Sequence, residues 1–188
     1  GTLRLCNRRT GERLAGLAGH GHGGIAWCEY SPDGTSILSS VGEIPAVAAP
    51  RPMTALLGGL IPPTFQQPTA PMVGDISLWD GKSGAHLRVL TLAARSRGKV
   101  ACCAFSPDGS RILAGGGEYS PGWLKVWERA TGCEIVSVSS PRRLCAGAWS
   151  HDGRRILAAW DEGKALQVLD SASGRVEATL RASGWDPV

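Results

Sequence analysis

The basic residues that could bind a ligand gather in three short segments. They are His20 and His22, then Arg95, Arg97 and Lys99, then Arg142 and Arg143. Arginine makes bidentate, charge-assisted contacts with carboxylates and phosphates, so the two later segments could bind an acidic or phosphorylated peptide. The alternative is that these side chains are solvated charges without a partner. Both interpretations stay open at this point.

The residue types of other sites occur, but without the spacing that chemistry needs. The histidines lack a third ligand from Cys, Asp or Glu at a recognisable spacing, which favours a structural role over metal binding. Ser150, His151 and Asp152 are adjacent, and adjacency in sequence is not triad geometry. Residues 115–122 are glycine-rich, yet no helix and no Lys-Ser/Thr follow as in a phosphate-binding loop, so we expect a flexible turn there. We expect no enzyme activity, no metal and no cofactor.

Composition sets broad limits on the function. The chain has 188 residues and a net charge of +4, with sixteen arginines and four lysines, which does not by itself indicate nucleic acid. Its six cysteines include no CxxC pair, so buried, reduced thiols and a cytoplasmic or nuclear location are expected. No signal peptide or spanning segment is evident, since the apolar stretch at residues 53–61 is too short.

The basic segments lie between copies of a repeating unit, shown most clearly by residues 100–132. Two apolar runs of strand length, 100–105 and 111–114, flank the turn sequence Ser-Pro-Asp-Gly. Proline fixes φ at the second position of such a turn, and glycine accepts the positive φ that closes it. The run 124–127 adds a third strand before Thr131-Gly132 turns the chain again.

Copies of this unit align on the third strand and the turn after it. In order they read LRLCN then TG (3–11), ISLWD then SG (76–84), LKVWE then TG (124–132) and LQVLD then SG (166–174). The hairpin turn also repeats, and its aspartates are Asp33, Asp108 and Asp152, with 44 residues between the last two. Trp79, Asp80 and Trp127 are further repeat positions, for which we predict a structural role.

A period in the low forties, with four strands and a Trp-Asp ending, resembles the WD40 repeat, whose units fold as four-stranded blades of a β-propeller. The resemblance covers the whole chain except residues 43–73. It implies an all-β fold, a partial β-propeller of about three and a half four-stranded antiparallel blades. In this family a Gly-His pair precedes the inner strand, and the histidine joins a hydrogen-bonded network with a Ser or Thr, an Asp and the Trp.

The alignment divides the chain at the repeat boundaries. We expect a half blade at 1–18, blades at 19–93, 94–140 and 141–182, and a tail at 183–188. Closed propellers need roughly four to eight blades, so the chain is interpreted as a fragment or an unusual partial propeller in a larger chain or complex. Its two end blades would each expose an apolar face.

An insertion interrupts the second blade at residues 43–73. It contains seven of the twelve prolines and almost no charge, so it should be extended or irregular. A tolerated surface loop is one interpretation, because loops accept added length at little cost in free energy. The other is a docking segment that covers an apolar patch on a partner or on this chain.

The family resemblance implies that loops from an outer strand to the next inner strand share one rim with the loops between second and third strands. The three basic segments and the insertion would then leave from the same rim. A non-catalytic scaffold for protein partners is therefore the leading function. An RNA- or nucleoprotein-associated subunit is the alternative, although the loops lack aromatic residues for stacking on bases. An enzyme is the third and least supported class.

Overall fold

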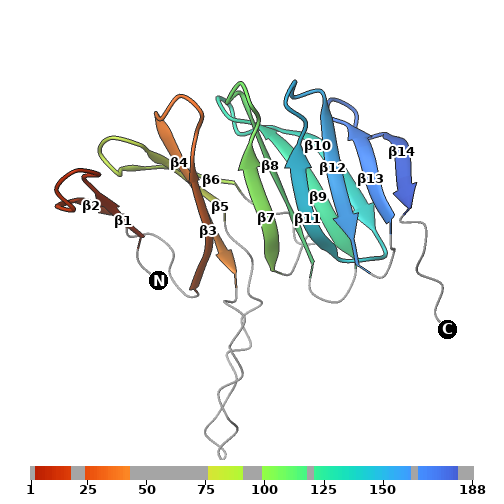
Figure 1. Cartoon of the computed structure of the whole chain (residues 1–188), viewed down its shortest axis with the longest axis horizontal. Helices are drawn as coiled ribbons and strands as arrows, with labels where there is room; N and C mark the ends of the chain where they lie inside the picture. Colours follow the sequence, from red (N-terminus) through yellow and green to blue (C-terminus); the bar gives the residue numbers. More distant parts are fainter. Residues whose placement is uncertain are drawn as a thin grey trace, which may run out of the picture.

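The computed structural model describes residues 3–17, 24–42, 76–90, 99–117, 121–161 and 165–181. Within these ranges the regular secondary structure consists of β-strands, arranged as sheets that stand side by side along the molecule (Figure 1). None of the described residues forms a helix long and apolar enough to cross a membrane.

Each sheet is an antiparallel meander in which neighbours in sequence are neighbours in space. The first contains β1 (Leu3–Cys6) and β2 (Arg13–Leu17), and the second β3 (Gly24–Tyr30), β4 (Ser36–Gly42), β5 (Ile76–Asp80) and β6 (His86–Leu90). The third contains β7 (Val100–Phe105), β8 (Arg111–Gly116), β9 (Gly122–Glu128) and β10 (Glu134–Ser140). The fourth contains β11 (Leu144–Trp149), β12 (Arg155–Trp160), β13 (Ala165–Asp170) and β14 (Val176–Arg181). The predicted fold class is therefore confirmed, as a partial propeller of four-stranded antiparallel blades.

The hairpin turns form as their sequences predict. In the third sheet Gly109 has a φ of 71°, and its N–H donates to the carbonyl oxygen of Ser106 at 2.8 Å. The carboxylate of Asp108 accepts the Ser106 hydroxyl at 2.6 Å and the Ser110 backbone N–H at 3.0 Å. These bonds close the turn between β7 and β8.

The conserved offset between the third strand and its hydroxyl-glycine pair also has a structural reason. The Asp80 carboxylate accepts the backbone N–H and the hydroxyl of Ser83, at 2.7 and 2.6 Å. Gly84 follows with a φ of 69° and donates its N–H to the carbonyl of Asp80 at 2.9 Å. Asp170, Ser173 and Gly174 repeat this arrangement.

The hydrophobic core lies between the sheets. Trp79 on β5 is 1% exposed and packs toward the first sheet with Leu5 and Leu17. Trp127 on β9 is 2% exposed and packs in the layer between the second and third sheets. Leu169 on β13 takes the same place in the next layer. Each of the three stands opposite an isoleucine of the preceding strand, so the repeat positions have equivalent surroundings.

Two expectations about local structure need correction. Residues 115–122 were expected to be one turn, but β8 continues to Gly116 and β9 already begins at Gly122. The cysteines were expected to be buried, but only Cys102 and Cys103 are. The third sheet is covered on both faces, which buries these two neighbours together. The other four, Cys6, Cys28, Cys133 and Cys145, are exposed and free.

The far face of the fourth sheet is apolar and exposed. Leu157, Leu166 and Leu180 are 37%, 38% and 52% exposed. They alternate along their strands with the residues that face the third sheet, such as Ile156 and Leu169. This matches the expected open face of an end blade. The insertion at 43–73 and the tail lie outside the described residues, and the exact blade boundaries stay a prediction.

Candidate functional site

Two of the basic segments converge on the same end of the third sheet. Lys99 precedes β7, and its carbonyl oxygen accepts the N–H of Gly117 at 3.0 Å. The segment before β11 crosses Gly122, where an added Cβ would lie 2.9 Å from the Cα of Arg143. Gly117 and Gly122 are themselves adjacent. We call this surface, formed by Lys99, Arg142 and Arg143, the basic rim.

The two arginines of the basic rim differ in their surroundings. Arg143 makes an ion pair with Asp161, at 3.0 Å between Nη2 and Oδ2, and both side chains are about half exposed. The carbonyl of Arg143 also accepts the Asp161 N–H at 2.8 Å. Arg142 has an exposed side chain, and its backbone N–H donates to the Ser140 hydroxyl at 3.1 Å. Arg142 therefore projects its charge into solvent, while Asp161 partly neutralises Arg143.

The remaining predicted rim residues, His20, His22, Arg95 and Arg97, lie outside the described residues. Their participation stays a prediction. Asp161 was not anticipated from sequence, although its position directly after β12 places it beside the segment that precedes β11.

The repeat aspartates lie at the opposite rim, where the hairpin turns gather at the upper edge in Figure 1. The Ser31 hydroxyl, with further bonds from Thr35, holds the pKa of Asp33 well below its usual range. The Ser106 hydroxyl and the Ser110 N–H lower the pKa of Asp108 to about 2. The Ser150 hydroxyl lowers the pKa of Asp152 in the same way. Each of these carboxylates therefore accepts hydrogen bonds within its own turn.

The hydrogen-bonded pair expected at the tryptophan occurs in the second sheet. Trp79 donates its Nε1–H to the Ser39 hydroxyl at 2.8 Å, and both residues are buried. Ala114 occupies the position of Ser39 beside Trp127, by the register of β8 and β9. The third sheet therefore lacks this acceptor, in agreement with the absence of a Gly-His pair before it.

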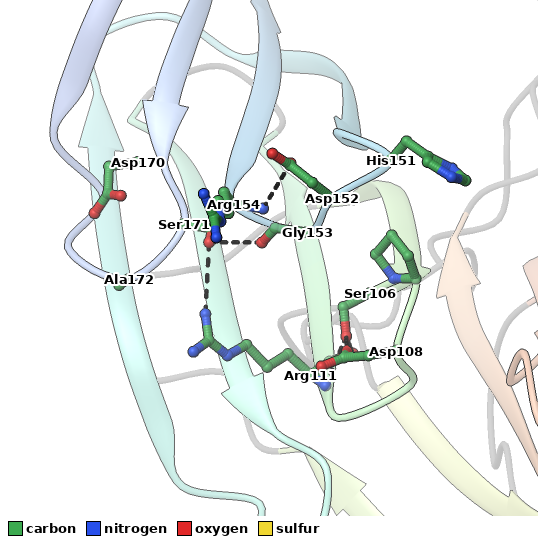
Figure 2. A pocket seen from close by; sticks show the side chains of 11 residues that line it. Ser106, Asp108, Arg111, His151, Asp152, Gly153, Arg154, Asp170, Ser171 and Ala172 are labelled. Carbon is green, nitrogen blue, oxygen red and sulfur yellow. Dashed lines mark hydrogen bonds between the residues drawn. The ribbon is translucent and has the colours of Figure 1, made fainter.

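A cavity of about 680 Å³ opens at the turn rim, between the third and fourth sheets (Figure 2). Three turns contribute its walls: the β7–β8 turn, the β11–β12 turn and the β13–β14 turn. Its charged and polar lining includes Asp108, Arg111, His151, Asp152, Arg154, Asp170 and Ser171. We call it the Arg111–Ser171 pocket.

His151 and Asp152 line this pocket, but together with Ser150 they do not form a catalytic relay. The Ser150 hydroxyl donates directly to the Asp152 carboxylate at 2.6 Å. It also contacts the backbone of Arg155. His151 points away from Asp152 in Figure 2, and the Ser150 hydroxyl donates to Asp152 itself, so the three residues do not form a Ser-His-Asp relay in this arrangement.

Metal ligands and buried thiols can be considered for the part of the chain that the structure describes. No group of three or more His, Cys, Asp or Glu residues there could hold a metal ion. Burial raises the pKa of Cys102 to about 11 and that of Cys103 to about 12. Both thiols are therefore protonated at neutral pH and unsuited to nucleophilic attack.

Comparison with protein families gives a match for residues 87–128, to the model described as WD40: WD domain, G-beta repeat. The matched span runs from β6 of the second sheet through β7, β8 and β9 of the third. One repeat in sequence therefore straddles two sheets in space. A comparison with curated proteins finds no match.

Proposed function

Because the chain carries a WD40 repeat at residues 87–128 and folds into blades of that type, we propose that it is a non-catalytic scaffold for protein partners. WD40 repeats typically belong to interaction scaffolds. The proposed contact surface is the basic rim, and the proposed ligand is an acidic or phosphorylated segment of another protein.

The convergence of Lys99, Arg142 and Arg143 on Gly117 and Gly122 is the observation that supports this surface. Glycine at 116 and 122 lets two separate basic segments approach one sheet end, because an added Cβ would lie 1.9 Å from the Lys99 carbonyl oxygen and 2.0 Å from that of Arg142. Charges from different segments then face one ligand, and arginine can bind a carboxylate or phosphate through two parallel hydrogen bonds. In the sequence, the insertion at 43–73 lies between β4 and β5, as residues 117–121 lie between β8 and β9, and the ends of β4 and β5 are the basis for proposing it as part of the same contact surface.

Arg142→Glu tests the proposal directly. The Arg142 side chain is exposed, so the substitution reverses its charge without breaking a described ion pair. The matched control is Lys82→Glu, since Lys82 is also exposed in a turn with its backbone N–H capped, here by Asp80 at 3.1 Å. Fluorescence anisotropy with a glutamate-rich peptide should show roughly tenfold weaker binding for Arg142→Glu, equivalent to about 1.4 kcal/mol. The control should bind like the wild type.

Equal affinities for the two variants would refute the basic rim as the contact surface. A single-stranded RNA probe, titrated with salt, separates the nucleic-acid alternative. Phosphate-dominated binding weakens linearly in the logarithm of the salt concentration, with a steep slope. Tighter binding of RNA than of the peptide, with such a slope, would favour the RNA-associated subunit instead.

A further inference from the structure

Arg129 joins the second and third sheets at the turn rim. Its Nη1 donates to the Asp33 carboxylate at 3.1 Å and to the carbonyl of Gly109 at 3.2 Å. Its Nη2 donates to the hydroxyls of Thr35 and Ser36, at 2.5 and 2.9 Å. This guanidinium therefore uses most of its donors in one inter-sheet contact.

The corresponding contact between the third and fourth sheets exchanges the two partners. Ser171 follows Asp170 as Arg129 follows Glu128, and Arg111 begins β8 as Ser36 begins β4. An arginine and a serine thus face each other at both places, but each comes from the opposite sheet. Here the distance from Arg111 Nη1 to Ser171 Oγ is 3.5 Å, and the Ser171 hydroxyl donates to the carbonyl of Gly153 at 2.8 Å.

Because the partners are exchanged, Arg111 has N–H donors without a described acceptor beside the Arg111–Ser171 pocket. Among the described residues, its side chain has one long hydrogen bond and no carboxylate within ion-pairing distance. Yet Arg111 is only partly exposed, at the wall of the cavity of about 680 Å³. A partly buried guanidinium gains most from a charged acceptor that binds bidentately.

The three aspartates of the pocket do not act as a bidentate acceptor for Arg111. Asp108 accepts the hydroxyls of Ser106 and Ser110, and Asp152 and Asp170 are bound in the same way within their own turns. Figure 2 shows Arg111 extending toward Ser171 and away from Asp108. Each carboxylate is therefore bonded within its own turn, through Oδ1 in Asp152 and Asp170 and through both oxygens in Asp108. Arg111 attracts Asp170 electrostatically, but among the described residues its one side-chain hydrogen bond goes to Ser171.

We propose that the Arg111–Ser171 pocket binds an oxyanion carried on a partner peptide, namely a side-chain carboxylate or phosphate. Arg111 supplies the bidentate contact, and Arg154 and His151 also line the pocket and offer further N–H donors. The cavity volume exceeds what one phosphate ion needs and falls within the range of ligand pockets, roughly 300–1,000 Å³. Pro107 and Ala172 add apolar surface for the stem of a side chain.

This site lies on the rim opposite to the basic rim and depends on different residues. Arg142→Glu affects the basic rim and Arg111→Gln affects this pocket, so either proposal can fail while the other stands.

The decisive variant exchanges the partners, Arg111→Ser with Ser171→Arg, in the 188-residue chain. It rebuilds the arrangement of Arg129 and Ser36 and keeps the net charge. The new arginine would enter the Arg111–Ser171 pocket from the fourth sheet. The probes are inorganic phosphate, a blocked glutamate-containing peptide and the same peptide with phosphoserine. Binding is followed through the Nε–H signal of Arg111 in ¹H–¹⁵N spectra and through fluorescence anisotropy.

We expect the peptides to shift the Arg111 signal and to bind at least tenfold more tightly than inorganic phosphate. Arg111→Gln and the exchange variant should each lose at least tenfold in peptide affinity, while Lys82→Glu should not. The exchange variant should keep the wild-type melting temperature. If it fails to fold, Arg111→Gln decides the question.

An unchanged Arg111 signal, or unchanged peptide affinity in Arg111→Gln, would overturn the proposal. Inorganic phosphate that binds as tightly as the peptides would overturn the assignment to a partner side chain and leave a site for a free ion.

Discussion

Glu134→Gln tests how the third sheet tolerates a charge inside an inter-sheet layer. Lys125 lies two residues before Trp127 on β9, on the face that packs against the second sheet, and its side chain is 5% exposed. Its Nζ contacts Glu134 Oε2 at 2.5 Å. Ser77 and Gln167 hold this position in the other two four-stranded sheets, and Arg4, which holds it in the first sheet, is exposed, so the buried cation is peculiar to the third sheet. Removing the negative partner leaves the ammonium group buried and uncompensated.

The size of the effect follows from the burial of the two partners. Breaking a fully buried pair from one side costs about 3–5 kcal/mol. Glu134 is 37% exposed, so water screens part of the interaction, and we expect about 2 kcal/mol for Glu134→Gln. In a chain of this size that lowers the melting temperature by about 4–8 °C.

Thermal unfolding followed by circular dichroism measures the effect, with Glu177→Gln as the control. Glu177 pairs with Arg155 at 2.7 Å, but that pair lies on the surface, so its loss should leave the melting temperature unchanged. Lys125→Met with Glu134→Gln should recover most of the lost stability, because a methionine suits the apolar layer. A melting temperature for Glu134→Gln within 1 °C of the wild type would refute the reasoning.

Three further predictions concern the turns, the thiols and the rim. The lowered pKa of Asp108 means that its contribution to stability is complete above its unfolded pKa of about 3.9 and is lost as the pH falls toward about 2. Asp108→Asn should flatten the pH dependence of the urea midpoint in that interval, and an unchanged slope would contradict this. Cys102 and Cys103 should resist alkylation at pH 8 until urea unfolds the chain, as counted by mass spectrometry, while the four exposed cysteines react at once. Gly122→Ala places a Cβ against the Arg142–Arg143 backbone, so it should destabilise the chain by about 1–3 kcal/mol in urea titration and weaken peptide binding.

The fold could be predicted from the sequence because the strongest sequence patterns form local structure. The Ser-Pro-Asp-Gly turn and the turn with the hydroxyl-glycine pair are each held by hydrogen bonds between neighbouring residues. The spacing of these motifs was therefore enough to locate the hairpins. The tryptophan position was predictable for a related reason, since equal spacing places Trp79 and Trp127 on the same face of equivalent strands. The exposed cysteines were missed because strand alternation does not reveal which face another sheet covers.

The Arg111–Ser171 pocket could not be derived in the same way. Its walls come from three separate turns, and Arg111 and Ser171 are 60 residues apart in sequence. The exchange of arginine and serine can be recognised only once the sheets are known to be neighbours. A trace of it exists in the repeat alignment, where Ser36 corresponds to Arg111 and Arg129 to Ser171. Two positions that differ together between copies indicate contact, but the Ser36 position occurs in only three described sheets, which are too few examples to find the pair.

The repeats also allow equivalent positions to be compared within one molecule. Their backbones are equivalent, so a difference between two sheets isolates the effect of the side chains at one position. At the first inter-sheet contact the guanidinium of Arg129 donates to four acceptors and links the two sheets. At the second, Arg111 reaches a single hydroxyl and a cavity remains. The same residue types therefore make a structural clip in one place and leave binding capacity in the other, which is why the exchange variant tests the site more sharply than any deletion.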